Sequence, residues 1–523
     1  MKYGPLALSF DYGTQSIRAI LFDKTGETRC KVKIEFEEPY FSTQVGFAEQ
    51  DPDFYWQKFI EAAKLCKEKA GELWNDVVAM SIDTFRDSII FLDKDMKPLR
   101  PMILYLDQRI VNHPVDCMPK NMTRLYKLVG MLDTASSQYA ATKCNWVAKY
   151  EPKIWAKTEK LVMLSGYLYY KLTGELMDST ASQVGHVPYD HKKSCWQSDH
   201  SITSCIFECK RDKMVDKLYK PCEQMARVSR EIAEITGLKE GLPIISSGAD
   251  KACETLAVGC DGNDVAAISL GTAATIEITT DKYVEPMPFL PAYTSIQYGK
   301  FNPEVLIFRG YWMISWFKNQ FAQPEIKKAE ELGTIPEKLL DEEMAKIPVG
   351  SEGLVLQPYW TAGVNTPEAK GSIIGWSDCH TRIHLYRAIV EGIGLAMYDG
   401  MKNMEKRAGY KIKRVMISGG GASSRIVCQI MADLLGVPVQ KVQTYETSAL
   451  GAAMASFTGV GEFNSLQDAV KAMSHIKEEY IPNKENHKLY DTIYKDVYSH
   501  IYKSNKKIFR NIRTIQRRNP GYM

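Results

Sequence analysis

The sequence lacks the features that mark several large classes of protein. No stretch approaches the ~18 consecutive apolar residues that a membrane-spanning helix needs, and the N-terminal residues contain no apolar run followed by a signal cleavage site. The 12 cysteines form no Cys-x-x-Cys motif, and Cys205 and Cys209 lack the neighbouring His or Cys residues that would complete a zinc site. We therefore expect a cytoplasmic protein with reduced thiols and no membrane partner.

An excess of charge of one sign is also absent outside the C-terminal tail. The net charge is only +3, and the last 21 residues contribute seven basic residues and no acidic one. The rest of the chain is slightly acidic, so we expect no nucleic-acid partner for the body of the protein. Within the tail, Ile501, Ile508, Ile512 and Ile515 share one helical face, which predicts a helix packed on the body.

The common nucleotide-binding motifs are missing as well. There is no G-x-x-x-x-G-K-[ST] motif, and no G-x-G-x-x-G motif follows a strand and opens a helix. A P-loop NTPase and a Rossmann dehydrogenase are therefore poor interpretations of this chain.

What is present is a long α/β pattern. A length of 523 residues predicts about three domains or two large lobes. Strands are expected at residues 6–10 and 17–22 and around 32–36, followed by a helix and a buried strand at 77–82. Because helix and strand signals keep alternating, we expect sheets covered by helices.

The first strand–turn–strand unit has a counterpart in the middle of the chain. Residues 265–270 and 273–278 read as strands joined by Gly271-Thr272, as Gly13-Thr14 joins the first pair. Such an internal repeat suggests two related lobes with a cleft between them. Further along, we expect a helix at 381–405, a strand at 414–418, a turn at Gly419-Gly420-Gly421, a helix at 425–435 and helical structure from about residue 468.

These turns could hold a nucleotide. Glycine lets the backbone approach a phosphate, and successive N–H groups form an anion-binding nest. Asp11, at the end of the first strand, could hold Mg²⁺, which prefers oxygen ligands. The triple glycine would let a base or ribose lie against the backbone. Ordinary turn chemistry and the start of a helix explain the same residues without a ligand.

The order of these motifs resembles the FGGY family of carbohydrate kinases, within the superfamily that also contains actin. The resemblance runs from about residue 6 to about 462 and is most specific at residues 371–375 and 384–392, with Trp376 where an aliphatic residue is usual. Further matches are residues 49–52, 107–109, 170–175 and 432–436.

The resemblance implies an α/β fold of two ribonuclease-H-like (actin-like ATPase) lobes, each a mixed sheet with flanking helices, separated by a cleft. The implied divisions are an N-terminal lobe at 1–252, a C-terminal lobe at 253–500 and a basic tail at 501–523. The implied activity is transfer of the γ-phosphate of ATP, with Mg²⁺, to a hydroxyl of a small sugar or polyol such as xylulose, ribulose, glycerol or erythritol. Dimers are common among such enzymes, so a homodimer is also an expectation.

The resemblance also implies roles for individual residues. Asp250 matches the general base that takes the proton from the substrate hydroxyl; its place before a predicted helix at 251–258 also suits a helix N-cap. Asp11 would organise Mg²⁺. The residues implied to bind ATP are Gly13, Thr14, Gln15, Ser16, Arg18, Gly271 and Thr272 for the phosphates and Gly420, Gly421, Ala422 and Ser424 for the nucleoside.

Substrate binding is expected in the loop at residues 84–87. Arg86 and Asp87 are more similar to the glycerol-kinase branch than to the Met-His of xylulose kinases, and together they suit adjacent hydroxyls. A surface salt bridge is the alternative. Tyr105 stands where the family often has Trp, and Gln138 where glycerol kinases have Tyr, so glycerol itself is in doubt.

Two other functions remain open at this point. An actin- or chaperone-like ATPase of the same superfamily would need a partner-binding segment, and none is visible. A catalytically inactive sensor is the second, because Tyr311 and Trp312 stand where small residues are common. These aromatic rings would either reshape the nucleotide pocket or pack beneath it.

Overall fold

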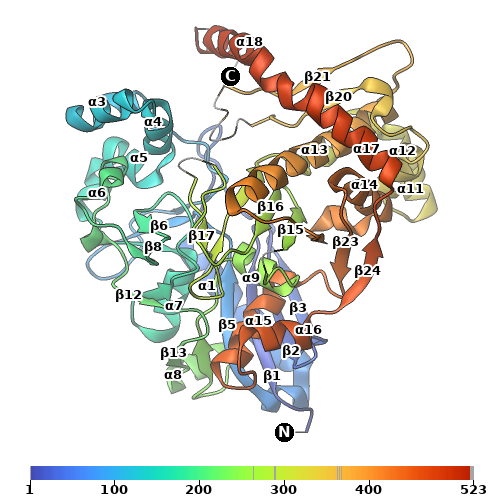
Figure 1. Cartoon of the computed structure of the whole chain (residues 1–523). Coiled ribbons are helices and arrows are strands. Elements are labelled where there is room, and N and C mark those ends of the chain that lie inside the picture. Colours follow the sequence, from blue (N-terminus) through green and yellow to red (C-terminus); the bar gives the residue numbers. More distant parts are fainter. Residues whose placement is uncertain are drawn as a thin grey trace.

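A computed structural model describes residues 2–262, 264–287, 290–361, 363, 366 and 368–518. Two six-stranded sheets form the centre of the molecule, and helices flank them (Figure 1). The sheets belong to the two halves of the chain, as the internal repeat predicts.

The first sheet has the strand order β13-β14-β5-β1-β2-β3. β1 and β2 form an antiparallel hairpin, and β5 runs parallel to β1. β1 extends through Tyr12, so Asp11 lies within the strand rather than in the turn that the sequence predicts. The bounds are β1 Leu6–Tyr12, β2 Ser16–Asp23, β3 Thr28–Glu35, β5 Val77–Thr84, β13 Gln224–Arg227 and β14 Pro243–Ile245.

The second sheet, β19-β16-β15-β22-β23-β24, repeats this arrangement. β15 and β16 form an antiparallel hairpin, and β22 runs parallel to β15. This correspondence confirms the two-lobed α/β fold. The bounds are β15 Val265–Leu270, β16 Ala274–Ile278, β19 Glu304–Ile307, β22 Arg414–Ser418, β23 Val439–Val442 and β24 Ile476–Tyr480.

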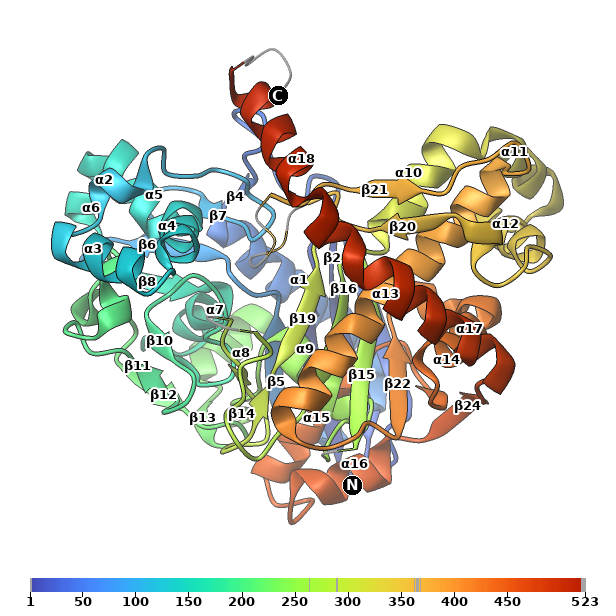
Figure 2. The same ribbon diagram turned by 45° about the horizontal axis from the view of Figure 1, so that its top comes forward.

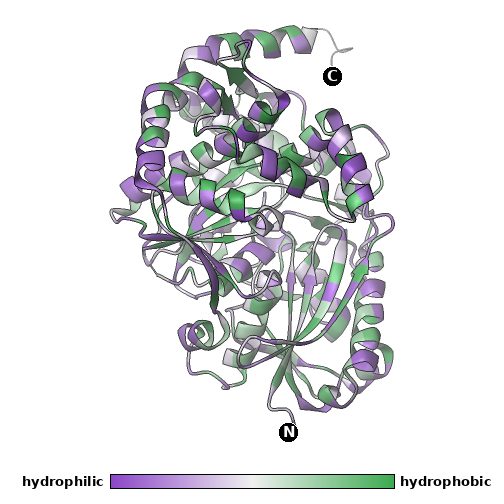
Figure 3. Cartoon of the chain, turned by 90° about the vertical axis from the view of Figure 1, so that its right-hand side faces the viewer, coloured by the Kyte–Doolittle hydropathy of each residue, from purple (hydrophilic) through white to green (hydrophobic). Residues whose placement is uncertain are grey.

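Capped amphipathic helices cover the sheets. In α1, Asp51 accepts a hydrogen bond from the backbone N–H of Asp53, and Pro52 occupies the first helical position. Thr381 similarly caps α13. Hydrophobic residues gather in the strands and on the helix faces that cover them (Figure 3). These helices are α1 Pro52–Ala70, α7 Leu164–Thr173, α8 Arg230–Thr236, α9 Asp250–Ala257, α13 Arg382–Ala408, α14 Arg425–Leu435 and α15 Thr447–Gly459.

Helix α15 packs against the first sheet although it follows the second in sequence. It contacts α9, β1 and β5, and its residues share an apolar cluster with Ala7, Ile20 and Phe22. Inside this contact Ser81 Oγ donates to the carbonyl oxygen of Ala452 at 2.8 Å. Helices α9 and α15 therefore form the layer between the two sheets.

Smaller elements extend each lobe, and Figure 2 shows α2–α6 and α10–α12 on opposite flanks. On the first lobe they are β4 Glu49–Gln50, β6 Ile89–Leu92, β7 Met102–Ile103, β8 Lys160–Met163, α2 Pro114–Cys117, α3 Lys120–Leu128, α4 Leu132–Ala141, α5 Lys143–Tyr150, α6 Pro152–Lys157, β9 Met177–Ser179, β10 Tyr189–Asp190, β11 Cys195–Trp196 and β12 Lys217–Tyr219. On the second they are β17 Tyr293–Thr294, β18 Phe301–Asn302, α10 Trp312–Phe321, α11 Gln323–Leu332, α12 Pro336–Met344, β20 Val355–Gln357 and β21 Ser372–Ile374.

The C-terminal region differs from the prediction of continuous helix after about residue 468. β24 lies between α16 (Leu466–Met473) and α17 (Lys484–Ile493) and pairs with β23 as the edge of the sheet. Its sequence, Ile-Lys-Glu-Glu-Tyr, is mostly exposed and charged, so it carries no clear strand periodicity.

Helix α18 (Ser499–Arg518) spans the described part of the basic tail, but the predicted packing of its isoleucines is wrong for three of the four. Ile501 is buried, whereas Ile508, Ile512 and Ile515 are exposed. Phe509 of this helix is also buried, and Glu368 accepts hydrogen bonds from Tyr502 and Arg510. No helix in the described part of the chain is long and apolar enough to cross a membrane. All 12 cysteines are free thiols.

Candidate active site

The predicted site residues lie at matching ends of strands in the two sheets. Asp11 and Asp83 are register partners on the parallel strands β1 and β5, and Ser269 and Ser418 are partners on β15 and β22. Parallel strands place their carboxyl ends at the same edge of a sheet. The repeat therefore places Asp11 and Asp83 at one edge of the first sheet and Ser269 and Ser418 at the corresponding edge of the second. Both edges lie at the ends of α9 and α15.

Asp11 and Arg18 form an ion pair across the first hairpin. Arg18 Nη1 donates to Asp11 Oδ2 at 2.7 Å, and Arg18 Nε lies 3.2 Å from Glu446 Oε2 just before α15. Asp11 is 5% exposed, and this burial raises the pKa of its carboxyl group. A carboxylate in this position provides the hard oxygen ligand that Mg²⁺ prefers, so the residues present fit the ion.

At the first hairpin turn, Thr14, which is predicted to bind phosphate, contacts Tyr105, which is predicted to bind the substrate. The N–H of Gly13 donates to the carbonyl oxygen of Ser16 at 3.0 Å, and the hydroxyls of Thr14 and Tyr105 are 2.8 Å apart. The side chain of Ser16 is buried, whereas that of Gln15 is exposed.

Asp250 is the first residue of α9 rather than its N-cap, which is Ala249. Its Oδ1 accepts a hydrogen bond from the backbone N–H of Lys251 at 2.7 Å. Burial raises the pKa of Asp250 to about 6, despite the opposing effect of Arg86 and Lys251. A carboxyl group with this pKa is ionised at neutral pH and can accept a proton.

Lys251 and Glu254, which the sequence analysis did not single out, tie α9 to the second lobe. Lys251 Nζ donates to Ser269 Oγ at 2.7 Å and pairs with Glu254. Glu254 in turn accepts a hydrogen bond from the hydroxyl of Ser418. The helix that carries Asp250 is thereby fixed to the strands that precede Gly271 and the triple glycine.

The triple glycine packs tightly except at its middle position. A Cβ on Gly421 would lie 2.6 Å from the ring of Tyr311, whereas a Cβ on Gly420 would meet no atom within 4 Å. Tyr311 therefore packs beneath this turn, and the N–H of Trp312 donates to the carbonyl oxygen of Thr272 at 3.2 Å. For Tyr311, the structure supports the second of the two alternatives.

The other residues predicted to bind the nucleoside have structural contacts. Ala422 is fully buried, and Ser424 is the N-cap of α14, where its hydroxyl accepts from the N–H of Val427 at 3.2 Å. Gly271 and Thr272, which are predicted to bind the phosphates, form the turn between β15 and β16, and Thr272 is exposed.

In the substrate loop, Arg86 and Asp87 do not pair with each other, so the alternative of a surface salt bridge between them is wrong. Arg86 forms two hydrogen bonds to Glu304 of β19, at 2.7 and 2.9 Å. Asp87 accepts from Lys143 Nζ at 3.1 Å and lies 2.8 Å from Nδ1 of His186. Burial would raise the pKa of Asp87, but the charge of Lys143 and the hydrogen bonds from His186 hold it well below its usual range.

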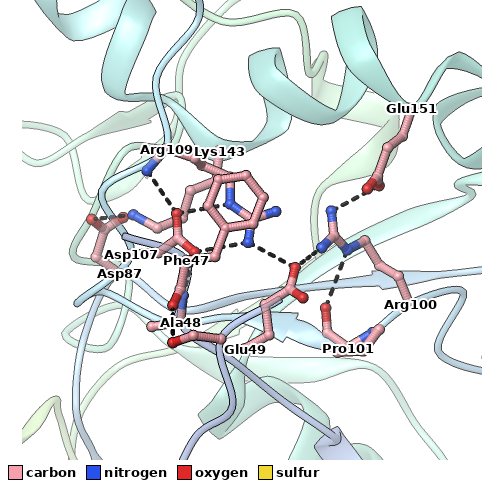
Figure 4. A network of polar contacts seen from close by, with 11 residues as sticks. Phe47, Ala48, Glu49, Asp87, Arg100, Pro101, Asp107, Arg109, Lys143 and Glu151 are labelled. Carbon is pink, nitrogen blue, oxygen red and sulfur yellow. Dashed lines mark hydrogen bonds and ion pairs between the residues drawn. The ribbon is translucent and has the colours of Figure 1, made fainter. Parts of the chain in front are cut away.

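A polar network beside this loop accounts for two motifs of the sequence (Figure 4). Arg109 Nε donates to Asp107 at 2.7 Å, and its Nη2 donates to Glu49 at 2.7 Å. The guanidinium lies over the ring of Phe47, 3.9 Å from its centre. Arg100 also pairs with Glu49. These buried contacts fix the segment that carries Tyr105, so they position the site rather than form it.

Further buried polar residues complete the region around Arg86. Glu277 lies opposite Glu304 in the β16–β19 register, and burial raises the pKa of Glu277 to about 8. Burial lowers the pKa of His191 to about 3, and its Nδ1 accepts from the N–H of Thr294 at 3.1 Å. A glutamate inside the apolar strand Ala-Thr-Ile-Glu-Ile is the signal that could have revealed Glu277.

Gln138 is the predicted site residue that the structure does not join to the others. It lies on α4, and its carbonyl oxygen accepts from the N–H of Thr142. Among the described residues, no hydrogen bond connects its side chain with the substrate loop. Lys143, five residues later, is the residue of this segment that reaches Asp87.

Comparison with known proteins shows similarity to sugar kinases over nearly the whole chain. The chain is 28% identical over 508 residues to the xylulose kinase of Lactococcus lactis, covering 96% of this chain and 97% of that one. It is 26% identical over 496 residues to the gluconokinase of Bacillus subtilis, with 93% of each chain covered. The structure of a ligand-bound xylulose kinase from Lactobacillus acidophilus superposes with a TM-score of 0.81 at 20% identity, covering 97% of this chain and 100% of that one, and so shares the fold.

Family-level matches cover both lobes. Residues 6–257 match the N-terminal domain of the FGGY family of carbohydrate kinases, and residues 266–459 match its C-terminal domain. An ATP-dependent sugar or polyol kinase is thereby supported, and the sensor and the actin-like ATPase are not. The protein belongs to the FGGY family of carbohydrate kinases.

Proposed function

We propose that this kinase phosphorylates a neutral ketose or polyol and that Asp250 is its general base. The observation that supports the assignment is the position of Asp250: a partly buried carboxylate at the first turn of α9, the helix that Lys251 and Glu254 tie to the strands of the second lobe. Its Oδ1 is fixed by the N–H of Lys251, so the carboxylate is oriented before substrate binds. A positioned base of this kind contributes roughly 10²–10⁴-fold to the rate.

The remaining site residues would bind and orient the reactants. The turns at Gly13-Thr14 and Gly271-Thr272 present backbone N–H groups and hydroxyls for the phosphates of ATP, and Gly420 leaves open space for its nucleoside. Asp11 would hold Mg²⁺, which neutralises phosphate charge when bound. Asp250 accepts the proton of the attacking hydroxyl. In phosphoryl transfer the protein mainly positions groups and balances charge, so rigid hairpins suit this task.

The charge balance of the substrate loop favours a neutral substrate. Arg86 is neutralised by Glu304, Lys143 by Asp87, and Lys251 by Glu254. A sugar acid would need a cation without such a partner to bind its carboxylate. Paired donors and acceptors instead suit the hydroxyls of a neutral sugar. We therefore expect ketoses or polyols to be better substrates than gluconate.

The test is ADP release by the full-length protein with Mg·ATP and a panel of xylulose, ribulose, glycerol, erythritol and gluconate. We expect one neutral compound to stimulate turnover and Asp250→Asn to abolish that increment without lowering the melting temperature. Stimulation by gluconate alone would contradict the neutral-substrate proposal, and an active Asp250→Asn variant would contradict the assignment of the base.

A further inference from the structure

Arg309 lies beside the hairpin turn Gly271-Thr272 of the second lobe. The strand that precedes it, β19, pairs with β16, and Ile307 lies opposite Ala274 at the start of β16. Beyond β19 the two backbones stay in close contact, because a Cβ on Gly310 would lie 2.4 Å from Cβ of Ala274. Arg309 is therefore the immediate neighbour of the residue that touches the turn predicted to bind phosphate.

The guanidinium of Arg309 is oriented by the aromatic ring of Trp312. Its Cζ lies over this ring, 4.9 Å from the centre, and a cation at this distance is attracted to the face of an indole. Trp312 is itself fixed to the turn, since its N–H donates to the carbonyl oxygen of Thr272 at 3.2 Å. Stacking uses the face of the guanidinium and leaves the N–H donors at its edge available. Within the described part of the chain, this partly buried side chain forms no hydrogen bond and no ion pair.

Other cations at the proposed site have acidic partners. The ion pairs are those of Arg18 with Asp11 and Glu446, Arg86 with Glu304, Lys143 with Asp87, and Lys251 with Glu254. Arg309 is therefore a positive charge at the site that the described residues leave unbalanced. An anion with several oxygen atoms would supply both the opposite charge and the missing acceptors. A phosphate group meets both needs, because its oxygens match the planar fork of a guanidinium.

We propose that Arg309 binds the phosphate groups of ATP at the Gly271-Thr272 turn. Its segment also borders the predicted nucleoside site, because the ring of Tyr311 packs beneath Gly421. The carboxylate of a sugar acid is the other anion to consider, but the substrate loop belongs to the first lobe, whereas Arg309 belongs to the second. The nucleotide is therefore the occupant that the position of Arg309 favours. This inference deepens the proposed function, on which it rests, by adding a charged phosphate ligand to the turns.

A purely structural role for Arg309 would have different consequences. In that case the side chain would only cover Trp312, as Lys220 covers Tyr298 with Nζ 4.6 Å from the ring centre. Lys220 lies between β12 and β13, the edge strand of the first sheet, and is not among the predicted site residues. Lys220→Gln is therefore the matched control, because it removes a cation from an aromatic ring outside the proposed site.

The experiment measures the binding of ADP and of adenosine to the full-length protein by titration calorimetry, with Mg²⁺ and without sugar. Arg309→Gln is expected to weaken ADP binding by about tenfold or more, because it removes charge-assisted hydrogen bonds to phosphate. Its adenosine binding should be unchanged, which also shows that the site remains folded. Arg309→Lys keeps the charge but not the fork, so its ADP affinity should lie between those of the wild type and Arg309→Gln. Added salt should weaken ADP binding more in the wild type than in Arg309→Gln, and Lys220→Gln should bind both ligands as the wild type does.

Equal ADP affinities of the wild type and Arg309→Gln would overturn the proposal, as would an equal loss of ADP and adenosine binding, which would indicate a role in shaping the pocket. A raised KM for gluconate with unchanged ADP affinity would assign Arg309 to a sugar carboxylate and overturn it as well. The fate of the proposed function is read separately from sugar-stimulated ADP release by the wild type and Asp250→Asn. A protein that loses ADP affinity in Arg309→Gln but phosphorylates no neutral sugar would retain the phosphate contact and contradict the proposed substrate.

Discussion

Arg86 of the first lobe and Glu304 of the second form a largely buried ion pair with two hydrogen bonds, at 2.7 and 2.9 Å. The two residues are 218 positions apart in sequence. Glu304 is 2% exposed, and the guanidinium of Arg86 also lies over the ring of Tyr293. The substrate loop of one lobe is therefore attached to a strand of the other.

Replacing one member of this pair should destabilise the protein strongly. Arg86→Met leaves the Glu304 carboxylate buried without its cation, so we expect the free energy of unfolding to fall by about 3–5 kcal/mol. The double variant Arg86→Met with Glu304→Met removes both charges and should recover much of that loss. Urea denaturation followed by tryptophan fluorescence measures both changes.

Activity measurements distinguish two roles of the Arg86–Glu304 pair, stabilising the fold and binding the substrate. The double variant should remain unable to phosphorylate the sugar, because it lacks the polar groups of the substrate loop. Glu72→Gln, which breaks the exposed ion pair with Lys2, is the control and should leave stability and activity unchanged. A double variant with full activity would show that Arg86 serves stability alone.

The raised pKa of Asp250 predicts the acid limb of the pH profile. Burial raises this pKa from 3.8 to about 6, so the base is lost as the pH falls through about 6. We expect kcat/KM to decrease about tenfold per pH unit below that point, because one proton blocks the base. Initial rates with sugar at low concentration, from pH 5 to pH 8, measure this.

The contribution of Asp250 to the free energy of unfolding should change with pH in the opposite direction from its contribution to activity. Because the folded state holds this proton more tightly than the unfolded state, the contribution of Asp250 to stability declines as the pH rises from 3.8 to about 6. Asp250→Asn should therefore be more stable than the wild type at pH 7 while inactive. An inactive variant with a lower melting temperature would point to misfolding rather than loss of the base.

Glu277 predicts a separate dependence of stability on pH. Burial raises its pKa from 4.5 to about 8, so the folded state binds a proton that the unfolded state has lost. Between these pH values the free energy of unfolding should fall by about 1.4 kcal/mol per pH unit from this group. Glu277→Gln should flatten the dependence, as measured by urea denaturation at pH 5 to 8. An unchanged slope in the variant would contradict the assignment.

The sequence was most informative where function and fold depend on contiguous residues. The Gly-Thr hairpins, the strands beside them and the helix at Arg425–Leu435 follow from local turn chemistry and periodicity. The partners of the substrate loop could not be predicted in this way, because Glu304 and His186 reach Arg86 and Asp87 only through tertiary structure. The edge strand β24 was missed because its charged residues carry no apolar pattern.

The triple glycine offers a matched pair of substitutions. A methyl group on Gly421 would lie 2.6 Å from the Tyr311 ring and 2.8 Å from Cβ of Leu270, whereas one on Gly420 would meet nothing within 4 Å. Gly421→Ala should therefore lower the free energy of unfolding by about 1–3 kcal/mol, as overpacking of a core does. Gly420→Ala should leave the melting temperature unchanged.

Kinetics then show which glycine faces the nucleotide. If the nucleoside of ATP lies against Gly420, a methyl group there occupies its space, and the KM for ATP should rise about tenfold, equivalent to ~1.4 kcal/mol. The KM for the sugar should not change, because the substrate loop lies on the other lobe. An unchanged KM for ATP in Gly420→Ala would place the nucleoside elsewhere and remove Gly420 from the nucleotide site.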